Sequence, residues 1–251
     1  MAKTVNINSL IEYVNYLEKE CKAEDILFRG QPRDDQSLLP RIARIKPKET
    51  VLQSERKMLQ EFKRQAIPHL GISPDNDWEW LALAQHHGMA TRLLDWTKNP
   101  LAALWFAVRE PRIRRINGVV WAFEVSETDR IEDTTKNPLR QNVTRVYQPN
   151  NITARIAAQQ GWFTVHGYNK KTKRFIPLEK NVRYKNRLTK MRINQKFFPE
   201  IRFHLDRCGF NDASMFPDLG GLCRHAQWLN SFLKDEPEDL AKKAKKNLRN
   251  Y

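Results

Sequence analysis

The sequence predicts an α+β fold: a mixed central sheet flanked by helices, with a basic β-rich arm and a charged C-terminal tail. Two observations predict this class. Segments with helical periodicity and segments with strand composition interleave irregularly, unlike the regular alternation of a doubly wound sheet. The 251 residues suffice for one large domain. We therefore expect one domain over residues 1–233, with the arm at 170–196, and a tail over 234–251.

The expected elements of the N-terminal half follow from periodicity and from residues that start or stop helices. Apolar residues at helical spacing predict a first helix over residues 7–21, and Ser9 and Glu12 have the spacing of a capping box. The run DILFRGQ predicts a strand that meets a turn. The remaining expected elements are helices over 49–66 and 78–87, a strand over 92–97, and a helix that starts at Asn99-Pro100 and ends at Val108.

The C-terminal half begins with the most strand-like run in the chain, GVVWAFEV, which is β-branched and aromatic. A long polar connection follows it. A further strand is expected over 155–165, where Gly161 indicates a bulge or a close backbone approach. The last expected elements are a strand at 190–193, a helix over 198–208 closed by Gly209, and a core helix over 217–233.

The net charge of +15 indicates an anionic partner, although a basic surface that only aids solubility is the alternative. No run approaches the roughly 18 apolar residues of a membrane span, so no membrane partner is expected. The N-terminal residues do not have the pattern of a signal peptide. Cys21, Cys208 and Cys223 are scattered, which predicts buried thiols in a reducing compartment and no thiolate zinc site. We expect a cytoplasmic protein.

Two short motifs could carry chemistry. Phe28-Arg29-Gly30-Gln31 places an arginine at a strand end, where its guanidinium can clamp a phosphate or carboxylate, and glycine allows a ligand to approach the backbone. The alternative is an Arg29 that pairs with a buried acid such as Asp95. The run from Thr91 to Thr97 has polar residues in a segment that should be buried, which indicates either a site or an Arg92–Asp95 ion pair.

Two adjacent histidines, His86 and His87, lie where the third helix should end. They point about 100° apart on a helix, so they cannot easily share a metal, and no metal site is expected. One of them could act as a general acid or base, or contact a ligand. The alternative is a histidine that caps the C-terminal end of the helix.

Four motifs in order, ILFRGQ, AQHHGMATRLLDWTKNPLAALWFAV, RIAAQQGWFTVHG and SMFPDLGGL, resemble the FRG domain family. This family is named for its Phe-Arg-Gly motif, and its members are bacterial or phage-borne. The resemblance spans Ile26 to Leu222.

A second resemblance is to ADP-ribosyltransferases, which hold NAD with an Arg or His on one strand, a hydroxyl residue on a second and a catalytic Glu on a third. Arg29 and Thr97 match the first two positions. The chain departs from the pattern at the third, where it has Gln159 or Gln160. Because Gln supplies no charge to an oxocarbenium-like state, Asp218 or Glu79 would have to provide the carboxylate.

The second resemblance implies NAD as co-substrate. Arg29, with Gly30 and Gln31 beside it, would bind the pyrophosphate, and Thr97 would bind the nicotinamide ribose. Trp96 or Phe163 would stack on nicotinamide. His87 or Gln159 would position the acceptor, and Asp95 completes the set of catalytic candidates.

The basic arm predicts contact with nucleic acid, because dense Lys and Arg neutralise phosphates. Interleaved aromatics (Phe175, Tyr184, Phe197 and Phe198) could stack on unpaired bases, which favours single-stranded RNA. The alternative is a solvated hairpin whose aromatics belong to the core. The candidate nucleic-acid residues are Lys170, Lys171, Lys173, Arg174, Arg183, Lys185 and Arg187.

Three functions compete. The first is an NAD-dependent ADP-ribosyltransferase that modifies nucleic acid, such as RNA, as a toxin or anti-phage defence effector, with an antitoxin protein as partner. The second is a non-catalytic nucleic-acid-binding regulatory module. The third is a metal-dependent nuclease that uses His86, His87, Asp95 and Asp218. The observation that best separates these functions is whether Arg29, Thr97 and Gln159 converge on one cleft, with the arm at its rim.

Overall fold

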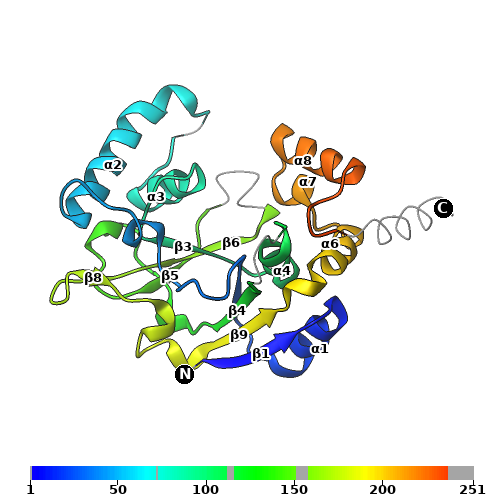
Figure 1. The fold of residues 1–251 in the computed structure, drawn as a ribbon. Helices are drawn as coiled ribbons and strands as arrows, with labels where there is room; N and C mark the ends of the chain where they lie inside the picture. The colour runs from blue at the N-terminus through cyan, green and yellow to red at the C-terminus, as the bar shows by residue number, and fades with distance from the viewer. Residues whose placement is uncertain (1, 72, 112–115, 151–157, 237–251) are drawn as a thin grey trace.

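The computed structural model describes residues 2–71, 73–111, 116–150 and 158–236, and it confirms the predicted α+β class (Figure 1). Its centre is a seven-stranded sheet in the order β1-β9-β4-β2-β3-β6-β5. The sheet is mixed, because β1 is parallel to β9 and every other neighbouring pair is antiparallel. The strands are β1 (Lys3–Ile7), β2 (Ile26–Gln31), β3 (Leu93–Thr97), β4 (Gly118–Glu124), β5 (Arg145–Tyr147), β6 (Gly161–Val165) and β9 (Leu188–Ile193), with a separate hairpin of β7 (Tyr168–Asn169) and β8 (Arg174–Phe175).

Most helices lie where caps and periodicity predict them. The N-cap side chains of Ser9, Thr50, Asn76 and Asn99 accept hydrogen bonds from the first turns of four helices. The α-helices are α1 (Leu10–Glu20), α2 (Val51–Ala66), α3 (Asp77–His86), α4 (Pro100–Val108), α6 (Phe198–Arg207), α7 (Asp212–Met215) and α8 (Leu219–Asn230). The 3-10 turns include η3 (Glu127–Asp129), η5 (Leu178–Lys180) and η6 (Lys185–Arg187).

One face of the sheet carries the helices. Phe28 of β2 lies opposite Thr97 of β3, so alternate residues of both strands share this face. α1, α4 and α6 cover the half around β2, β4 and β9, whereas α2 and α3 cover the half around β3 and β6 (Figure 1). The other face is covered by irregular segments that contribute Leu38, Leu178 and Tyr184 to the core.

The two halves of the sheet are joined weakly. Among the described residues, Phe28 opposite Thr97 is the single registered pair between β2 and β3. In contrast, β2 pairs with β4 over six residues and β3 pairs with β6 over five. The sheet therefore opens between β2 and β3 beyond this pair, on the face where α3 and α4 lie apart.

The structure corrects two of the predicted N-terminal and middle elements. Ile7 ends the unpredicted strand β1 rather than starting a helix, because pairing with β9 buries it, and the helix begins after its Ser9 cap. The strand expected over 155–165 begins at Gly161, with a turn at Gln159–Gln160, and residues 151–157 lie outside the described part. The polar connection contains one unpredicted strand, β5.

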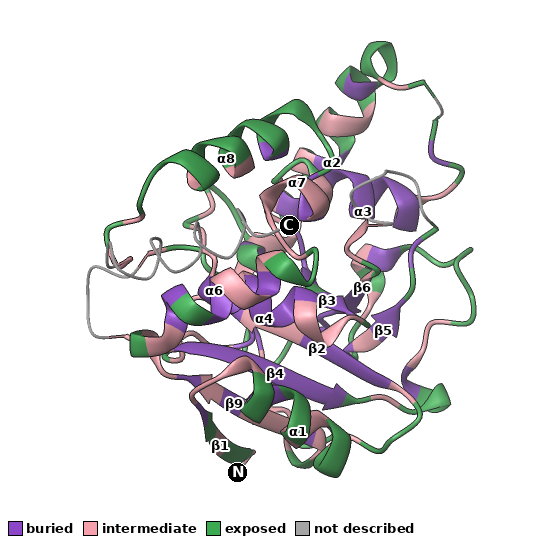
Figure 2. Cartoon of the chain, turned by 90° about the vertical axis from the view of Figure 1, so that its right-hand side faces the viewer, coloured by how far each residue is buried: buried purple, intermediate pink, exposed green. Residues whose placement is uncertain are grey.

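The last helix and two cysteines are also corrected. The helix predicted over 217–233 as a core helix is α8, and most of it is exposed (Figure 2). Cys208 and Cys223 are exposed and Cys21 is half-buried, so the prediction of buried thiols is wrong for the first two. At the start of the expected tail, Asp235 and Glu236 both pair with the buried Arg202.

Gly30 sets the distance between β2 and α4. A Cβ atom at this position would lie 1.8 Å from the carbonyl oxygen of Ala103 and 2.8 Å from the backbone nitrogen of Ala107. Because both are backbone atoms of one helix, the helix itself would have to move. We expect Gly30→Ala to lower the free energy of unfolding by about 2–3 kcal/mol, measured by chemical denaturation. Gly71→Ala is the control, because a Cβ there meets nothing within 4 Å; equal stability of both variants would contradict the prediction.

Candidate functional site

A cleft of about 650 Å³ lies where the sheet opens between β2 and β3. Its floor comes from these strands and the start of β6, and its walls come from the end of α3 and from α4. This size is ordinary for a site that holds a small molecule or nucleotide. The residues that line it are Phe28, Arg29, Gly30, Gln85, His86, His87, Gly88, Asp95, Trp96, Thr97, Phe106, Gln159, Gly161, Trp162 and Phe163.

Arg29 bridges the opening in the sheet. Its Nη1 donates to the backbone carbonyl oxygen of Asp95 at 2.7 Å and approaches Oδ2 of the same residue at 3.5 Å. The Arg29 side chain is 16% exposed, and burial lowers its pKa while the Asp95 carboxylate opposes that shift. The sequence-based alternative, an Arg29–Asp95 pair, is therefore present. However, its acid faces the cleft instead of being buried.

Asp95 is a carboxylate fixed on one side and open on the other. Gln85 Nε2 donates to both carboxylate oxygens at 3.1 Å. The buried Thr91 donates its hydroxyl to Gln85 Oε1 at 2.7 Å, which fixes the orientation of the amide. The Asp95 side chain nevertheless remains 56% exposed. Gln85 was not predicted as a site residue, because nothing in the sequence distinguishes it from a solvated helix position.

Thr97 and Gln159 both reach the cleft, as the transferase resemblance requires. Thr97 is 6% exposed, and its hydroxyl donates to the Gln159 carbonyl oxygen at 2.6 Å and accepts from the Asn99 backbone N–H at 2.9 Å. Gln159 Nε2 donates to the Met215 carbonyl oxygen at 2.9 Å. Both groups therefore bind protein partners and shape the wall of the cleft.

The aromatic side chain best placed for stacking is Phe106. Trp96 is 3% exposed, and its Nε1 donates to Thr164 on the opposite face of the sheet. Phe163 is 4% exposed and stacks on Tyr147. Phe106 is half-buried at the cleft and packs edge-on against Trp105 and Phe216. The uniformly apolar sequence of α4 did not show which of its aromatics faces a cavity.

The histidines lie at the mouth of the cleft. His86 ends α3, and His87 is its C-cap, followed by Gly88 with φ +84°. The helix-capping alternative for His87 is therefore present, and its side chain is exposed. The two rings lie edge-on with centroids 4.9 Å apart.

Several candidates lie away from the cleft. Gln31 is 2% exposed and accepts a hydrogen bond from Trp121 Nε1 on the other face. Glu79 is 5% exposed and accepts a bond from the backbone N–H of Asp75, and Asp218 caps α8. Within the part of the chain that the structure describes, no three His, Cys, Asp or Glu side chains are grouped to hold a metal ion.

Behind the cleft lies a buried polar layer. The predicted Arg92–Asp95 pair is wrong, because Arg92 binds Glu55 of α2 with both side chains fully buried. His166, which directly follows β6, is also buried, and burial together with the nearby Arg29 and Arg92 lowers its pKa to about 3. This histidine is therefore neutral near pH 7.

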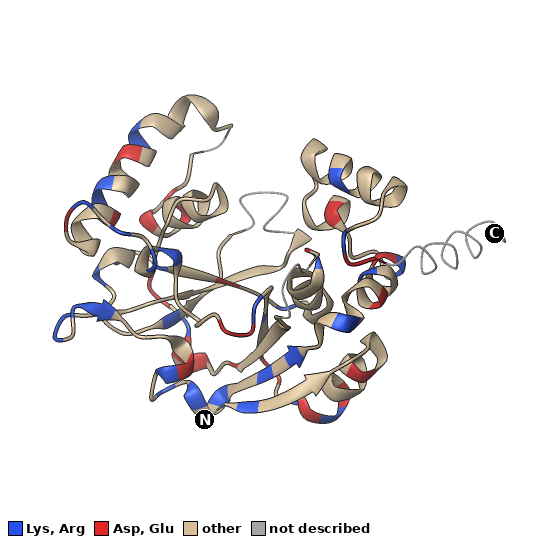
Figure 3. Cartoon of the chain, viewed as in Figure 1, with Lys and Arg blue, Asp and Glu red and all other residues tan. Residues whose placement is uncertain are grey.

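No residue of the basic arm (170–196) lines the cleft. Arg183 and Arg187 pair with the buried Asp129, and Lys185 lies between them in η6. Three of the four candidate stacking rings (Phe175, Tyr184 and Phe198) belong to the core, as in the alternative interpretation. The remaining cations form an exposed cluster on the β7–β8 hairpin, visible in Figure 3, without an ion pair among the described residues: Lys170, Lys171, Lys173 and Arg174.

Asp129 should make folding sensitive to acid. Burial alone would raise the pKa of its carboxyl group, but hydrogen bonds from Arg187 and Ser126 outweigh burial and lower the pKa to about 2. Because the folded-state pKa lies below the unfolded value, the stabilisation is complete above about pH 4 and is lost as the pH falls towards 2. We expect about 2 kcal/mol of stability to disappear over this window. Denaturation of wild type and Asp129→Asn across pH 2–7 measures it, and an equally steep decline in both would contradict the assignment.

Comparison with known families finds a match over part of the chain. Residues 24–115 match the FRG domain family. The match runs from the strand of Arg29 to the helix of Phe106 and includes Gln85 and Asp95. This confirms the predicted family resemblance over that range. Neither a curated protein nor a solved structure matches the chain. Among the described helices, none has the length and apolar character needed to cross a membrane.

Proposed function

We propose that this protein is an NAD-dependent ADP-ribosyltransferase that uses the β2–β3 cleft. The observation that carries the proposal is the exposed carboxylate of Asp95, held by Arg29 and Gln85 in a cleft of nucleotide size. In the transferase pattern a glutamate stands where this chain has Gln159. We propose that Asp95 provides the carboxylate instead, from β3, which pairs with β6.

The lining fits the parts of NAD. Phe106 offers an aromatic surface for the nicotinamide ring, and the edge of Arg29 and the mouth histidines offer donors for the pyrophosphate. The proposal gives Phe106 the stacking role that was expected of Trp96 or Phe163. Gly30 contributes by close packing on α4, and Thr97 by holding the turn at Gln159.

The chemistry then follows from charge. The bond between ribose C1′ and the nicotinamide nitrogen breaks, and the bonding electrons leave with neutral nicotinamide. Asp95 faces the positive charge that develops on the ribose, as carboxylates do in glycoside hydrolysis. The acceptor attacks C1′ and loses its proton to solvent or to the imidazole of the exposed His87.

Nucleic acid is the proposed acceptor, supported by the net charge of +15 and by the unpaired cations of the β7–β8 hairpin. Modification of RNA would harm the cell that contains the enzyme. This outcome fits a toxin or defence effector that a partner protein restrains.

The direct test uses NAD labelled in its adenylate phosphate, with RNA, DNA or protein lysate as acceptor. The proposal expects label on nucleic acid together with release of nicotinamide. In the same assay, Asp35→Asn is the control for the cleft variant Asp95→Asn. It removes an exposed carboxylate that lies outside the cleft and pairs with Arg33. Absence of both label transfer and nicotinamide release would overturn the proposal.

A second candidate function, a non-catalytic nucleic-acid-binding module, is favoured by the hairpin alone. It needs the cations but not the cleft. It predicts binding to nucleic acid without nicotinamide release under any condition, so the same assay separates the two functions.

The hairpin gives a prediction about salt that both functions share. Replacing Lys170, Lys171, Lys173 and Arg174 by Ala should weaken binding to single-stranded RNA. The slope of log K against log salt should fall by about 3, because each lost phosphate contact contributes roughly 0.7. Fluorescence anisotropy between low and moderate salt measures it. The matched control replaces four exposed lysines elsewhere, Lys19, Lys22, Lys46 and Lys48; if this control loses as much slope, the hairpin is not the binding surface.

A further inference from the structure

The outer face of α8 is an apolar surface exposed to solvent. Leu219 is 80% exposed, Leu222 is 55% exposed and Leu229 is 47% exposed, and Ala226 between them is also exposed. Their spacing of three, four and three residues places them within roughly 80° of one another around the helix. A helix usually turns such a stripe towards the core. Here it faces away, as the colour of α8 in Figure 2 shows.

The inner face of α8 explains this orientation. Gly221 is buried, and a Cβ there would lie 1.9 Å from the carbonyl oxygen of Phe216. Arg224 Nε donates to Asp212 at 2.9 Å, and its guanidinium lies over the Phe216 ring. Trp228 Nε1 donates to Glu236 at 3.0 Å. The inner face is therefore fixed by specific contacts, and the helix cannot rotate to bury the leucines.

The exposed apolar side chains are arranged symmetrically along the helix. Leu222 and Leu229 lie equally far from the peptide bond between His225 and Ala226. Leu219 and Phe232, which is 50% exposed just after the helix, are also equally far from it. In an antiparallel pair of α8 helices centred on this bond, Leu222 meets Leu229 of the second copy and Leu219 meets its Phe232. Every large exposed apolar side chain of the stripe then has an apolar partner.

Charge also permits a second copy at this surface. Residues 198–236, which contain α6 to α8, carry four Lys and Arg against six Asp and Glu, so the +15 charge of the chain resides elsewhere. This composition disfavours nucleic acid or an anionic membrane as the occupant. The antiparallel arrangement brings the exposed Lys234 of one copy near the exposed Asp218 of the other. It also sets the dipoles of the two helices antiparallel, which is the favourable orientation.

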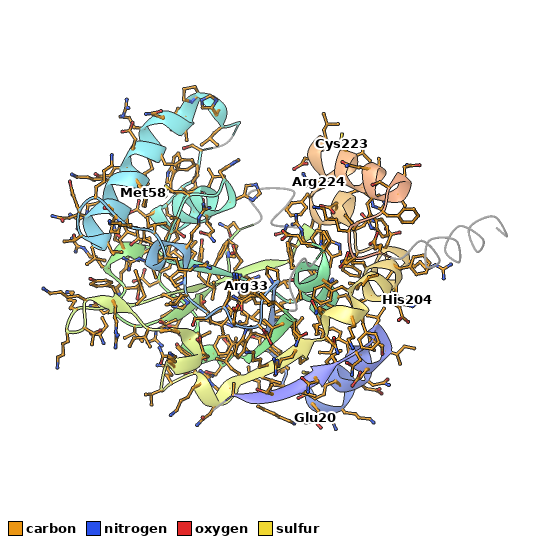
Figure 4. All side chains as sticks on the ribbon, viewed as in Figure 1. Glu20, Arg33, Met58, His204, Cys223 and Arg224 are labelled. Carbon is orange, nitrogen blue, oxygen red and sulfur yellow. The ribbon has the colours of Figure 1, made fainter. Side chains whose placement is uncertain are left out.

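We propose that two copies of this chain associate through antiparallel pairing of their α8 helices. The surface lies on the far side of the molecule from the β8 hairpin, near the labelled Cys223 and Arg224 in Figure 4, so the hairpins stay free. α7, which precedes α8, supplies the Met215 carbonyl that holds Gln159 at the cleft. Pairing therefore stabilises one wall of the cleft in each copy.

The interface of two helices of three turns is small compared with the roughly 1,600 Å² of a standard interface, so a reversible dimer is expected. Sedimentation velocity over about 1–100 µM should show the mass rising from monomer to dimer, the range in which micromolar affinity becomes visible. Leu222→Glu combined with Leu229→Glu should raise the dissociation constant at least tenfold. The matched control, Val143→Glu with Val182→Glu, introduces the same charges at exposed apolar positions elsewhere and should leave it unchanged.

The orientation has its own test. In a Cys208→Ser, Cys223→Ser background, Ala226→Cys should form an intermolecular disulfide under mild oxidation, because it lies beside the symmetry axis. Leu219→Cys should not, because its equivalent lies at the other end of an antiparallel pair. Circular dichroism confirms that each variant is folded. A chain that stays monomeric at every concentration overturns the proposal, as does efficient crosslinking through Leu219→Cys, which would indicate parallel helices.

Discussion

Replacing Glu55 by Gln is expected to destabilise this protein more than any other change of similar size, by about 3–5 kcal/mol. Oε1 of Glu55 accepts from the backbone N–H of Arg92 at 3.0 Å, and Oε2 accepts from Arg92 Nη2 at 2.7 Å. Both side chains have no exposed surface. The amide cannot balance the guanidinium charge, so a cation would remain buried without its counter-ion. Such a loss is a large fraction of the roughly 5–15 kcal/mol that stabilises a domain.

Urea denaturation measures this effect. Glu61→Gln is the control, because Glu61 pairs with Arg64 on the surface of the same helix and should change stability by less than about 1 kcal/mol. The double variant Glu55→Met, Arg92→Met should recover much of the loss, because it leaves no unpaired charge. A change below about 1 kcal/mol for Glu55→Gln would show that the pair does not hold α2 against β3.

The same pair shows where prediction from sequence ends. β3 and α4 could be located because their local patterns are strong: a short apolar strand and a helix that starts at Asn99-Pro100. The partner of Arg92 could not be predicted, because the nearest acid in the sequence, Asp95, binds Arg29 and Gln85 instead. The true partner, Glu55, is 37 residues away. Pairing over such a distance depends on the packing of α2, which no local pattern encodes.

Residues of the cleft were predicted from the sequence, but its shape was not, because the shape also depends on contacts between distant segments. Arg29, Asp95, Thr97 and Gln159 were all named from the sequence, and all of them line it. What the sequence did not contain is the opening between β2 and β3, which turns Arg29 towards Asp95 and makes the latter an exposed carboxylate. Similarly, β1 escaped prediction because its strand character depends on parallel pairing with β9, at the other end of the chain.

If the cleft catalyses ADP-ribosyl transfer, Asp95→Asn should reduce kcat for nicotinamide release by about 10²–10³-fold, which corresponds to roughly 3–4 kcal/mol of lost transition-state stabilisation. Asparagine has the same shape and can still accept a hydrogen bond from Gln85, so the variant removes charge and little else. Because positive charge develops on the ribose only as the nicotinamide bond breaks, KM for NAD should change little. Since Asp95 is 56% exposed, the free energy of unfolding should fall by less than about 1 kcal/mol.

Phe106→Ala provides the contrasting variant. Its ring is proposed to bind nicotinamide before and during bond cleavage, so its loss should raise KM for NAD more than it lowers kcat. Steady-state release of nicotinamide, with and without RNA, measures both parameters for the two variants and for wild type. If Asp95→Asn retains wild-type kcat while wild type is active, the carboxylate must come from elsewhere in the chain. A KM effect for Asp95→Asn with unchanged kcat would instead make Asp95 a binding residue, because its charge would then act equally on the ground state and the transition state.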